Sequence, residues 1–304
     1  MLPHSTKIPF IKMHGTGNDF VVLDAMAHPL PHDFDYGAAA LAMCHRRFGI
    51  GGDGLLLLDR PDKAAAVSAA VIRMRMWNPD SSEDMCGNGL RCIARLAHER
   101  GYVPGSGTGD EFGVQTLAGL RRAAMRNDGS VRVAMGQPHF VADEIPTLVT
   151  EPIEYSLMVD GTAIPHVTTL STGSTHTVIF RDAALDEAEF ARLSPRIEEH
   201  ACFPERTSIM WAHVIGPDEV QLRIWERGVG ETLACGTGAC ATAVAAQVTG
   251  RCGEKVTVRS RGGALHIRWK PDRDIEMTGA AQIVYEGEYS LWANDTNAGS
   301  KNKK

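Results

Sequence analysis

Two cysteines occupy matching positions in the chain, each directly before a Gly-x-Gly turn: Cys86-Gly87-Asn88-Gly89 and Cys235-Gly236-Thr237-Gly238. Each turn is predicted to open a helix, and its glycines allow the backbone to turn tightly. The first N–H groups of a helix are unsatisfied and carry a partial positive charge. Both features lower the pKa of a cysteine from its reference of about 8.5. We therefore expect both thiols to be competent bases.

A pair of such cysteines fits one kind of chemistry, the inversion of a carbon centre. One thiolate would remove a proton from one face of the carbon, and the other thiol would return a proton to the opposite face. The N–H groups of both turns would hold a carboxylate and stabilise the carbanion beside it. The pattern therefore predicts an acid–base site made from Cys86 and Cys235.

Cysteines and glycine-rich turns also occur in zinc sites and in nucleotide-binding sites, so both alternatives need to be considered. Cys86 with Cys92 and Cys235 with Cys240 lack the C-x-x-C spacing of structural zinc sites, so no metal is predicted. Glycine-rich runs also occur in nucleotide-binding proteins. The run from Gly49 to Gly54, however, precedes a leucine-rich strand, whereas a dinucleotide motif follows a strand and opens a helix. The Gly236 turn opens a helix, but its preceding strand lies several residues upstream, so no nucleotide is predicted either.

The other cysteines and two histidines are predicted to be structural. Free cysteines are usually buried as small hydrophobic residues. This expectation covers Cys44, Cys92, Cys202, Cys240 and Cys252, and His14 and His176 are expected to be structural as well.

The elements that position the two turns are predicted to be mixed α and β. The stretch Ala239–Val248 is small and apolar almost all round, which is typical of a helix buried in the middle of a domain. Cys92–His98 is its counterpart. Short β-branched runs such as Thr177–Phe180, Ile209–Val214 and Val256–Val258 read as strands that wrap around such a helix.

The chain repeats this organisation once. Five landmarks recur in the same order, offset by roughly 145–155 residues. They are a Thr-Gly turn before a strand, a helix-like stretch, an Arg-x-Trp strand, the Cys-Gly turn and a closing strand. Ordered recurrence of this kind predicts two homologous domains.

We therefore predict an α+β fold of two pseudo-symmetric domains, each a mixed, mostly antiparallel sheet around a central helix, with the active site in the cleft between them. The predicted N-terminal domain spans residues 1–139 and is completed by a C-terminal strand around 284–293. The second domain spans 140–283, and a disordered tail is expected at 294–304.

Composition narrows the class of protein. The 304 residues carry a formal net charge of −6, which disfavours nucleic acid and anionic membranes as partners. No apolar run approaches the ~20 residues of a membrane span, and the first residues do not form a signal peptide. The seven cysteines are an odd number, which does not suggest a disulfide framework. A cytoplasmic protein is the expectation.

The motifs together resemble the diaminopimelate epimerase family over nearly the whole chain, roughly residues 8–292. The matching stretches are KMHGTGNDFVVLD, RRFGIGGDGLLLL, WNPDSSEDMCGNGLRC, FPER, WERGVGETLACGTGAC and MTGAAQIVYEG. The resemblance implies conversion of LL-2,6-diaminopimelate to the meso form, for lysine and peptidoglycan precursors. It also implies no cofactor, no pyridoxal phosphate, no metal, and a homodimer.

The resemblance also implies roles for individual residues. Cys86 and Cys235 would be the acid–base pair, and Gly87, Asn88, Gly236 and Thr237 would surround the reacting carboxylate. The residues implied for the remaining substrate groups are Asn18, Asn78, Ser174, Ser208, Glu226 and Arg227.

Several positions depart from the family pattern, and all lie outside the acid–base motifs. The family has Gly-Asn-Pro-His where this chain has Gly173 to His176, and an asparagine in place of Ser208. A common glutamine is replaced by Gly54, and the segment from Asn78 to Cys86 is one residue short. The substrate is therefore less firmly indicated than the reaction type.

Other functions remain open on the sequence alone. A racemase of another amino acid would use the same cysteine pair. A thiol redox or metal-binding protein would show disulfide exchange or bound zinc and no exchange of an α-proton. A non-catalytic binding module would leave the paired cysteines unexplained.

Overall fold

The computed structural model describes residues 5–64, 69–103, 110–183 and 185–292. The predicted tail at 294–304 lies outside these ranges. The chain divides into two compact units: unit 1 comprises the residues up to Val133 and those from Ala280 onward, and unit 2 comprises Ala134–Gly279. No helix in the described ranges is long and apolar enough to cross a membrane.

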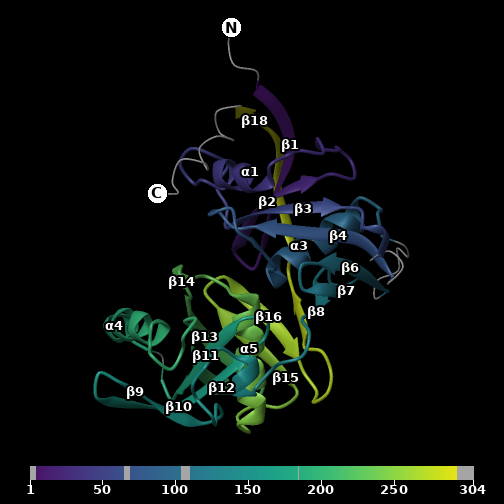
Figure 1. The fold of residues 1–304 in the computed structure, drawn as a ribbon. Helices are drawn as coiled ribbons and strands as arrows, with labels where there is room; N and C mark the ends of the chain where they lie inside the picture. Colours follow the sequence, from purple (N-terminus) through teal and green to yellow (C-terminus); the bar gives the residue numbers. More distant parts are fainter. Residues whose placement is uncertain (1–4, 65–68, 104–109, 184, 293–304) are drawn as a thin grey trace. The chain divides into compact units, whose positions relative to one another are not determined.

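Unit 1 contains a mixed sheet in which most neighbouring strands are antiparallel (Figure 1). Its strands, in order across the sheet, are β18 (Gln282–Trp292), β1 (Ser5–Gly15), β2 (Asn18–Asp24), β3 (Gly54–Asp59), β4 (Ala70–Trp77), β6 (Glu111–Thr116), β7 (Gly119–Met125) and β8 (Val131–Ala134). The short β5 (Glu83–Asp84) pairs with β4.

Unit 2 repeats this strand order. Its strands are β9 (Tyr155–Val159), β10 (Thr162–Ser171), β11 (Thr175–Arg181), β12 (Ser208–Gly216), β13 (Glu219–Glu226), β15 (Lys255–Ser260), β16 (Gly263–Arg268) and β17 (Glu276–Gly279). The short β14 (Gly230–Thr232) pairs with β13, as β5 pairs with β4 in unit 1. A 3₁₀ turn, η1, spans Ala142–Glu144.

The helices lie where parallel strands must be connected. Two pairs in each unit are parallel, β2 with β3 and β4 with β6 in unit 1, and β11 with β12 and β13 with β15 in unit 2. A parallel pair needs a crossover, usually a helix. In the described ranges these crossovers contain the helices α1 (Tyr36–Met43), α3 (Gly87–Glu99), α4 (Glu187–Glu198) and α5 (Gly236–Val248).

Helices α3 and α5 correspond to each other, and both are largely buried. Helix α3 contacts β1, β2, β3, β4, β7 and β18, and α5 contacts β10, β11, β12, β13, β15 and β16 (Figure 1). Each is followed by a glycine in the left-handed region, Gly101 (φ 71°) and Gly250 (φ 72°). The next residue then donates its N–H back into the helix, Tyr102 to Ala97 and Arg251 to Ala246.

Separate apolar clusters lie beside helices α1 and α4. In unit 1 the cluster includes Ile8, Phe10, Met43, Leu57 and Leu291. Leu291 belongs to the C-terminal strand β18, which pairs with β1 over almost its whole length. The last strand of the chain therefore completes the core that the first strands begin.

Candidate active site

Cys86 and Cys235 are the N-cap residues of α3 and α5, and their backbones are nearly identical. Their φ and ψ angles are −129° and 124° at Cys86, and −130° and 116° at Cys235. An N-cap residue leaves the helical conformation while its carbonyl accepts the first helical hydrogen bond. Each side chain is thus set at the positive end of a helix, as the sequence predicted.

The N–H groups of both turns precede the helical hydrogen bonds. The first such bond of α3 runs from the Leu90 N–H to the Cys86 carbonyl (2.8 Å), and that of α5 from Ala239 to Cys235 (2.9 Å). The N–H groups of Gly87 and Asn88, and of Gly236 and Thr237, come before these bonds and have no helical acceptor. Such groups form an anion site suited to a carboxylate.

The Cys86 thiol is partly exposed and lies beside two amide side chains. Its Sγ donates to Asn18 Oδ1 at 3.5 Å, and Asn88 Nδ2 donates to the same oxygen at 3.1 Å. Asn18 begins β2, which is next to β1 in the sheet. The structure therefore brings together three residues that the sequence assigned to the site.

The Cys235 thiol is in different surroundings. It is 7% exposed, and its Sγ accepts a hydrogen bond from the Gly238 N–H at 3.3 Å. Thr237 Oγ1 lies 3.4 Å from the same sulfur. A sulfur that accepts an N–H bond is stabilised as a thiolate, whereas one that donates to a carbonyl is stabilised as a thiol.

A second group of predicted residues lies in unit 2, at the start of β12 and the end of β13. Arg227 follows β13, and its N–H donates to Ser208 Oγ at 3.1 Å. The Arg227 guanidinium donates to the Glu205 carbonyl at 2.9 Å. Glu226, the last residue of β13, accepts a bond from Thr232 Oγ1. Ser208 thus positions the Arg227 backbone directly.

Ser174 lies in the loop between β10 and β11. Its carbonyl accepts a bond from His176 Nδ1 at 2.7 Å. Burial lowers the pKa of His176 to about 4, so its ring is neutral at physiological pH, and a structural role for it stays a prediction. Thr172 Oγ1 of the same loop donates to the Thr237 carbonyl at 2.9 Å, which ties the loop to the Cys235 turn.

Asn78 is placed differently from the other predicted residues. Its side-chain amide donates to Ser82 Oγ at 3.1 Å, and its carbonyl accepts the Ser81 N–H at 2.9 Å. These contacts stay within the turn between β4 and β5. A role for Asn78 toward a substrate therefore stays a prediction.

The sequence argument missed three residues that support the site. Asp53 accepts from Asn18, Thr172 anchors the Ser174 loop, and Glu198 is buried beneath the Arg227 turn. Glu198 accepts bonds from Trp225 Nε1 and from the Gly228 N–H, both at 2.7 Å. Asp53 lies in the glycine-rich run before β3, whose sequence pattern predicts no partner for it, and a glutamate buried on α4 gives no local signal.

The remaining thiols are less uniform than predicted. Burial raises the pKa of Cys44 and Cys92 to about 12, which makes both unreactive, and Cys240 is also buried. The expectation of burial is wrong for Cys202 and Cys252, which are only partly buried. Both lie in turns that follow a helix and not within one.

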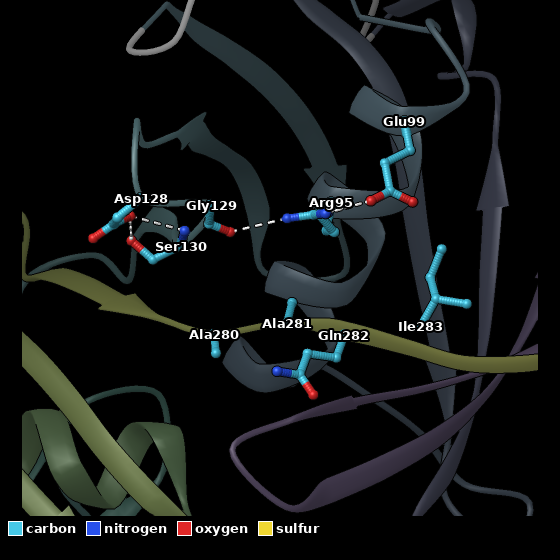
Figure 2. A pocket seen from close by; sticks show the side chains of 9 residues that line it. All are labelled: Arg95, Glu99, Asp128, Gly129, Ser130, Ala280, Ala281, Gln282 and Ile283. Carbon is cyan, nitrogen blue, oxygen red and sulfur yellow. Dashed lines mark hydrogen bonds and ion pairs between the residues drawn. The ribbon is translucent and has the colours of Figure 1, made fainter.

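Unit 1 also contains a hollow of about 490 Å³ away from the cysteine turn (Figure 2). Its charged groups satisfy one another: Arg95 donates to Glu99 at 2.6 Å, and Asp128 accepts the Ser130 hydroxyl at 2.6 Å. This hollow offers no arrangement for acid–base chemistry. Across the described ranges, no three His, Cys, Asp or Glu side chains cluster so as to hold a metal.

Comparison with known proteins identifies the family. The model of the family described as diaminopimelate epimerase matches residues 10–141 and 168–284. The chain is 44% identical to the diaminopimelate epimerase of Heliobacterium modesticaldum over 290 residues, which are 93% of this chain and 99% of that relative. It is 43% identical to the enzyme of Moorella thermoacetica, with the same coverage.

This chain belongs to the diaminopimelate epimerase family.

The fold of this family member also occurs in more distant proteins. A hydroxyproline epimerase from Agrobacterium vitis superposes with a TM-score of 0.66 at 14% identity, covering 94% of this chain and 93% of that one. A PhzF-family phenazine biosynthesis protein of Bacillus anthracis gives 0.65 at 17% identity, covering 93% and 99%. At such identities the likeness concerns the mixed α/β fold alone.

Proposed function

We propose that this chain catalyses the interconversion of LL- and meso-diaminopimelate by a two-base mechanism, with Cys86 and Cys235 as the acid–base pair. The observation that carries the proposal is the duplicated N-cap cysteine, in the same backbone conformation at the start of α3 and of α5. Family membership and the high identity to curated diaminopimelate epimerases support the substrate.

The hydrogen bonds around the two sulfurs support opposite starting roles. Cys235, which accepts from Gly238, begins as the thiolate and removes the α-proton. The electron pair of the broken C–H bond passes into the carboxylate, where the N–H groups of Gly87, Asn88, Gly236 and Thr237 stabilise it. Cys86, which donates to Asn18, begins as the thiol and delivers its proton to the opposite face. The two roles exchange in the reverse direction.

We further propose that units 1 and 2 are the two homologous domains expected from the repeat, and that their cysteines serve opposite faces of one substrate carbon. The shared strand order and the equivalent helices α3 and α5 support a duplication.

The residues that would bind the far end of diaminopimelate differ from the family pattern, so an amino acid with a different side chain remains a candidate substrate. Ser174 and Ser208 stand where the family has asparagines, and a serine hydroxyl reaches less far than an amide. Ser208 Oγ already accepts the Arg227 N–H, which leaves its O–H to donate elsewhere. A charged substrate group left without a partner would cost about 1–3 kcal/mol. We propose that Arg227, Thr175, Asn78 or water supplies the missing contacts.

Solvent deuterium incorporation at the α-carbon tests this proposal across a panel of amino acids. We expect LL-diaminopimelate to be exchanged and inverted with a higher kcat/KM than glutamate, histidine or lysine, without added pyridoxal phosphate and after dialysis against a chelator. If one of these single-ended amino acids were preferred by about tenfold, the substrate assignment would be wrong and the two-cysteine mechanism would stand. Failure to exchange any α-proton would refute both.

We also propose a homodimer working in the reducing cytoplasm. Strand β18 forms one edge of the unit 1 sheet, and it exposes Val284 (55%) and Tyr285 (46%). An exposed apolar edge strand is a surface on which a second chain can pair. Sedimentation equilibrium should give twice the chain mass, and a monomer at micromolar concentration would contradict this part.

A further inference from the structure

A continuous set of polar contacts runs from the surface of unit 1 to Cys86. Arg46 donates to Asp53 Oδ1 at 2.6 Å, and Asn18 Nδ2 donates to Asp53 Oδ2 at 2.7 Å. The opposite end of the Asn18 amide, Oδ1, receives both Asn88 Nδ2 and the Cys86 thiol. Asp53 is thus separated from Cys86 by a single amide side chain.

The chemistry of Asp53 determines which way the Asn18 amide points. A carboxylate only accepts hydrogen bonds, so the amide must turn its NH₂ group toward Asp53. The backbone N–H of Asp19 donates to the same Oδ2 at 3.1 Å, which further requires an acceptor at that position. The Asn18 carbonyl oxygen is then left facing Cys86. An acceptor beside a sulfur favours its protonated form over the thiolate.

The Asn88 amide is oriented in turn. It donates Nδ2 to Asn18, and its own Oδ1 is buried without a hydrogen-bond donor in the described part of the chain. The orientations of both amides therefore trace back to the carboxylate of Asp53.

We infer that Asp53 is a positioning residue that sets the protonation preference of Cys86 by fixing the orientation of the Asn18 amide. This inference rests on the proposed role of Cys86 and extends it to a residue that does not contact the sulfur. The ionisation of a thiol can be measured without turnover, so failure of this inference can be told apart from failure of the proposed function.

The loop that carries Asp53 is held firmly enough for such a role. The Asp53 N–H donates to the Asp19 carbonyl at 2.7 Å, and the Gly51 and Gly52 N–H groups donate to the carbonyls of Met43 and Cys44 at 3.0 Å. Arg46 also donates to Asp19 Oδ1 at 2.7 Å. The loop is therefore bound both to β2 and to the end of α1.

Other charged or titratable groups lie around this set of contacts. They are Lys12, Asp19, Arg46, Arg91 and Cys92. Lys12 pairs with Asp19 at 2.5 Å, and Arg91 donates to Thr16 Oγ1 at 2.7 Å. Asp19 carries the same charge as Asp53 and shares Arg46 with it, but its carboxylate is not bonded to the Asn18 amide. Asp19 therefore serves as the matched control.

The variant Asp53→Ala tests the inference directly. Without the carboxylate, the Asn18 NH₂ group loses the acceptor that holds it away from Cys86, so the Asn18 amide can turn its NH₂ toward the sulfur. A donor beside the sulfur favours the thiolate. We expect the apparent pKa of Cys86 to fall by about one unit, so that alkylation by iodoacetamide below that pKa becomes about tenfold faster. Peptide-level mass spectrometry of the full-length protein would follow Cys86 separately from the other thiols.

The control Asp19→Asn removes one negative charge close by without reversing the Asn18 amide. It should leave the alkylation profile of Cys86 within about twofold of the wild type. Equal shifts in the two variants would mean that Cys86 responds to charge alone, and no shift in Asp53→Ala would mean that Asp53 is only structural. Either result overturns the inference.

A double variant protects the test against a simple loss of folding. Asn18→Asp combined with Asp53→Ala keeps an oxygen toward Cys86 whichever way the side chain at position 18 turns, because both of its polar atoms are oxygens. That oxygen now carries charge, so we expect the pKa of Cys86 to rise above the wild-type value, opposite to Asp53→Ala. A fall of the pKa in the double variant would contradict the proposed orientation, and thermal unfolding would show whether each variant is folded.

Discussion

At the scale of single residues, two cysteines in the same backbone conformation have different neighbours. Cys86 donates to a side-chain carbonyl, and Cys235 accepts from a backbone N–H. The repeat supplies two equivalent thiols, and in the proposed mechanism the contacts around them differentiate the acid from the base. Inversion needs this difference, because one sulfur must hold a proton while the other lacks one.

Replacement of either cysteine by alanine should abolish epimerisation, because one face of the substrate carbon then lacks its proton acceptor or donor. We expect kcat to fall by about 10²–10⁴-fold for Cys86→Ala and for Cys235→Ala, with serine variants also severely impaired. The measurement is the rate of inversion of LL-diaminopimelate. Cys202→Ser is the matched control, since Cys202 is a partly exposed thiol remote from both turns in sequence, and it should be unaffected. Near-normal turnover in either alanine variant would refute the two-base assignment.

Asp19 should contribute to stability in a pH-dependent way. Burial alone would raise its pKa, but hydrogen bonds and charge from Arg46 and Lys12 outweigh burial and lower the pKa to about 2. A carboxyl whose pKa is depressed by folding stabilises the native state above its unfolded pKa, and the contribution disappears as pH falls through the folded value. Between about pH 4 and pH 2 the wild type should therefore lose on the order of 2 kcal/mol that Asp19→Asn does not lose. Urea unfolding at several acidic pH values measures this difference, and parallel pH profiles would contradict it.

At the scale of elements, the glycine-rich run before β3 has a packing role. The N–H groups of Ile50 and Gly51 donate to the Met43 carbonyl at the end of α1. A Cβ on Gly49 would overlap the carbonyl oxygen of Ala42 and lie 2.7 Å from that of Met43. The run thus folds closely over the end of a helix and presents Asp53 to Asn18, which explains the glycine pattern without a bound nucleotide.

Gly49→Ala should therefore destabilise the protein, because backbone atoms cannot move aside as a flexible side chain can. We expect a loss of about 1–3 kcal/mol in the free energy of unfolding. Gly253→Ala is the matched control, since a Cβ there meets nothing within 4 Å, and its effect should stay within about 0.5 kcal/mol. Denaturant unfolding of both variants measures the contrast, and equal effects would show that the loop relaxes freely.

At the scale of the whole molecule, two units share one topology but are built from the chain in different ways. In unit 2, β9 pairs with β10 just after it in the sequence, whereas in unit 1 the corresponding place beside β1 is taken by β18 from the far end of the chain. Leu291 of β18 packs with Ile8 and Phe10 of β1 in the unit 1 core. The core of unit 1 is therefore built from two distant stretches of the chain, one of which follows all of unit 2.

The sequence alone determined the two cysteine turns, the central helices and the repeat, because these features are local. In a Cys-Gly-x-Gly turn before an apolar helix, the N-cap residue and the glycines that form the turn are neighbours in the sequence. The same local pattern therefore predicts the same local structure in both halves of the chain. Those helices begin at Gly87 and Gly236, as expected. A role for Cys86 and Cys235 in one reaction is proposed from the same local chemistry, together with the family resemblance.

Only the tertiary structure decided which side chains support those turns. Asp53 reaches Asn18 because β2 and β3 are parallel neighbours, and Glu198 reaches the Arg227 turn from the end of α4. Such contacts join residues about thirty positions apart. They depend on strand pairing and helix packing, which cannot be predicted from a short sequence motif. The burial of Cys202 and Cys252 failed to follow from residue type for the same reason, since the exposure of a thiol depends on what the folded chain places over it.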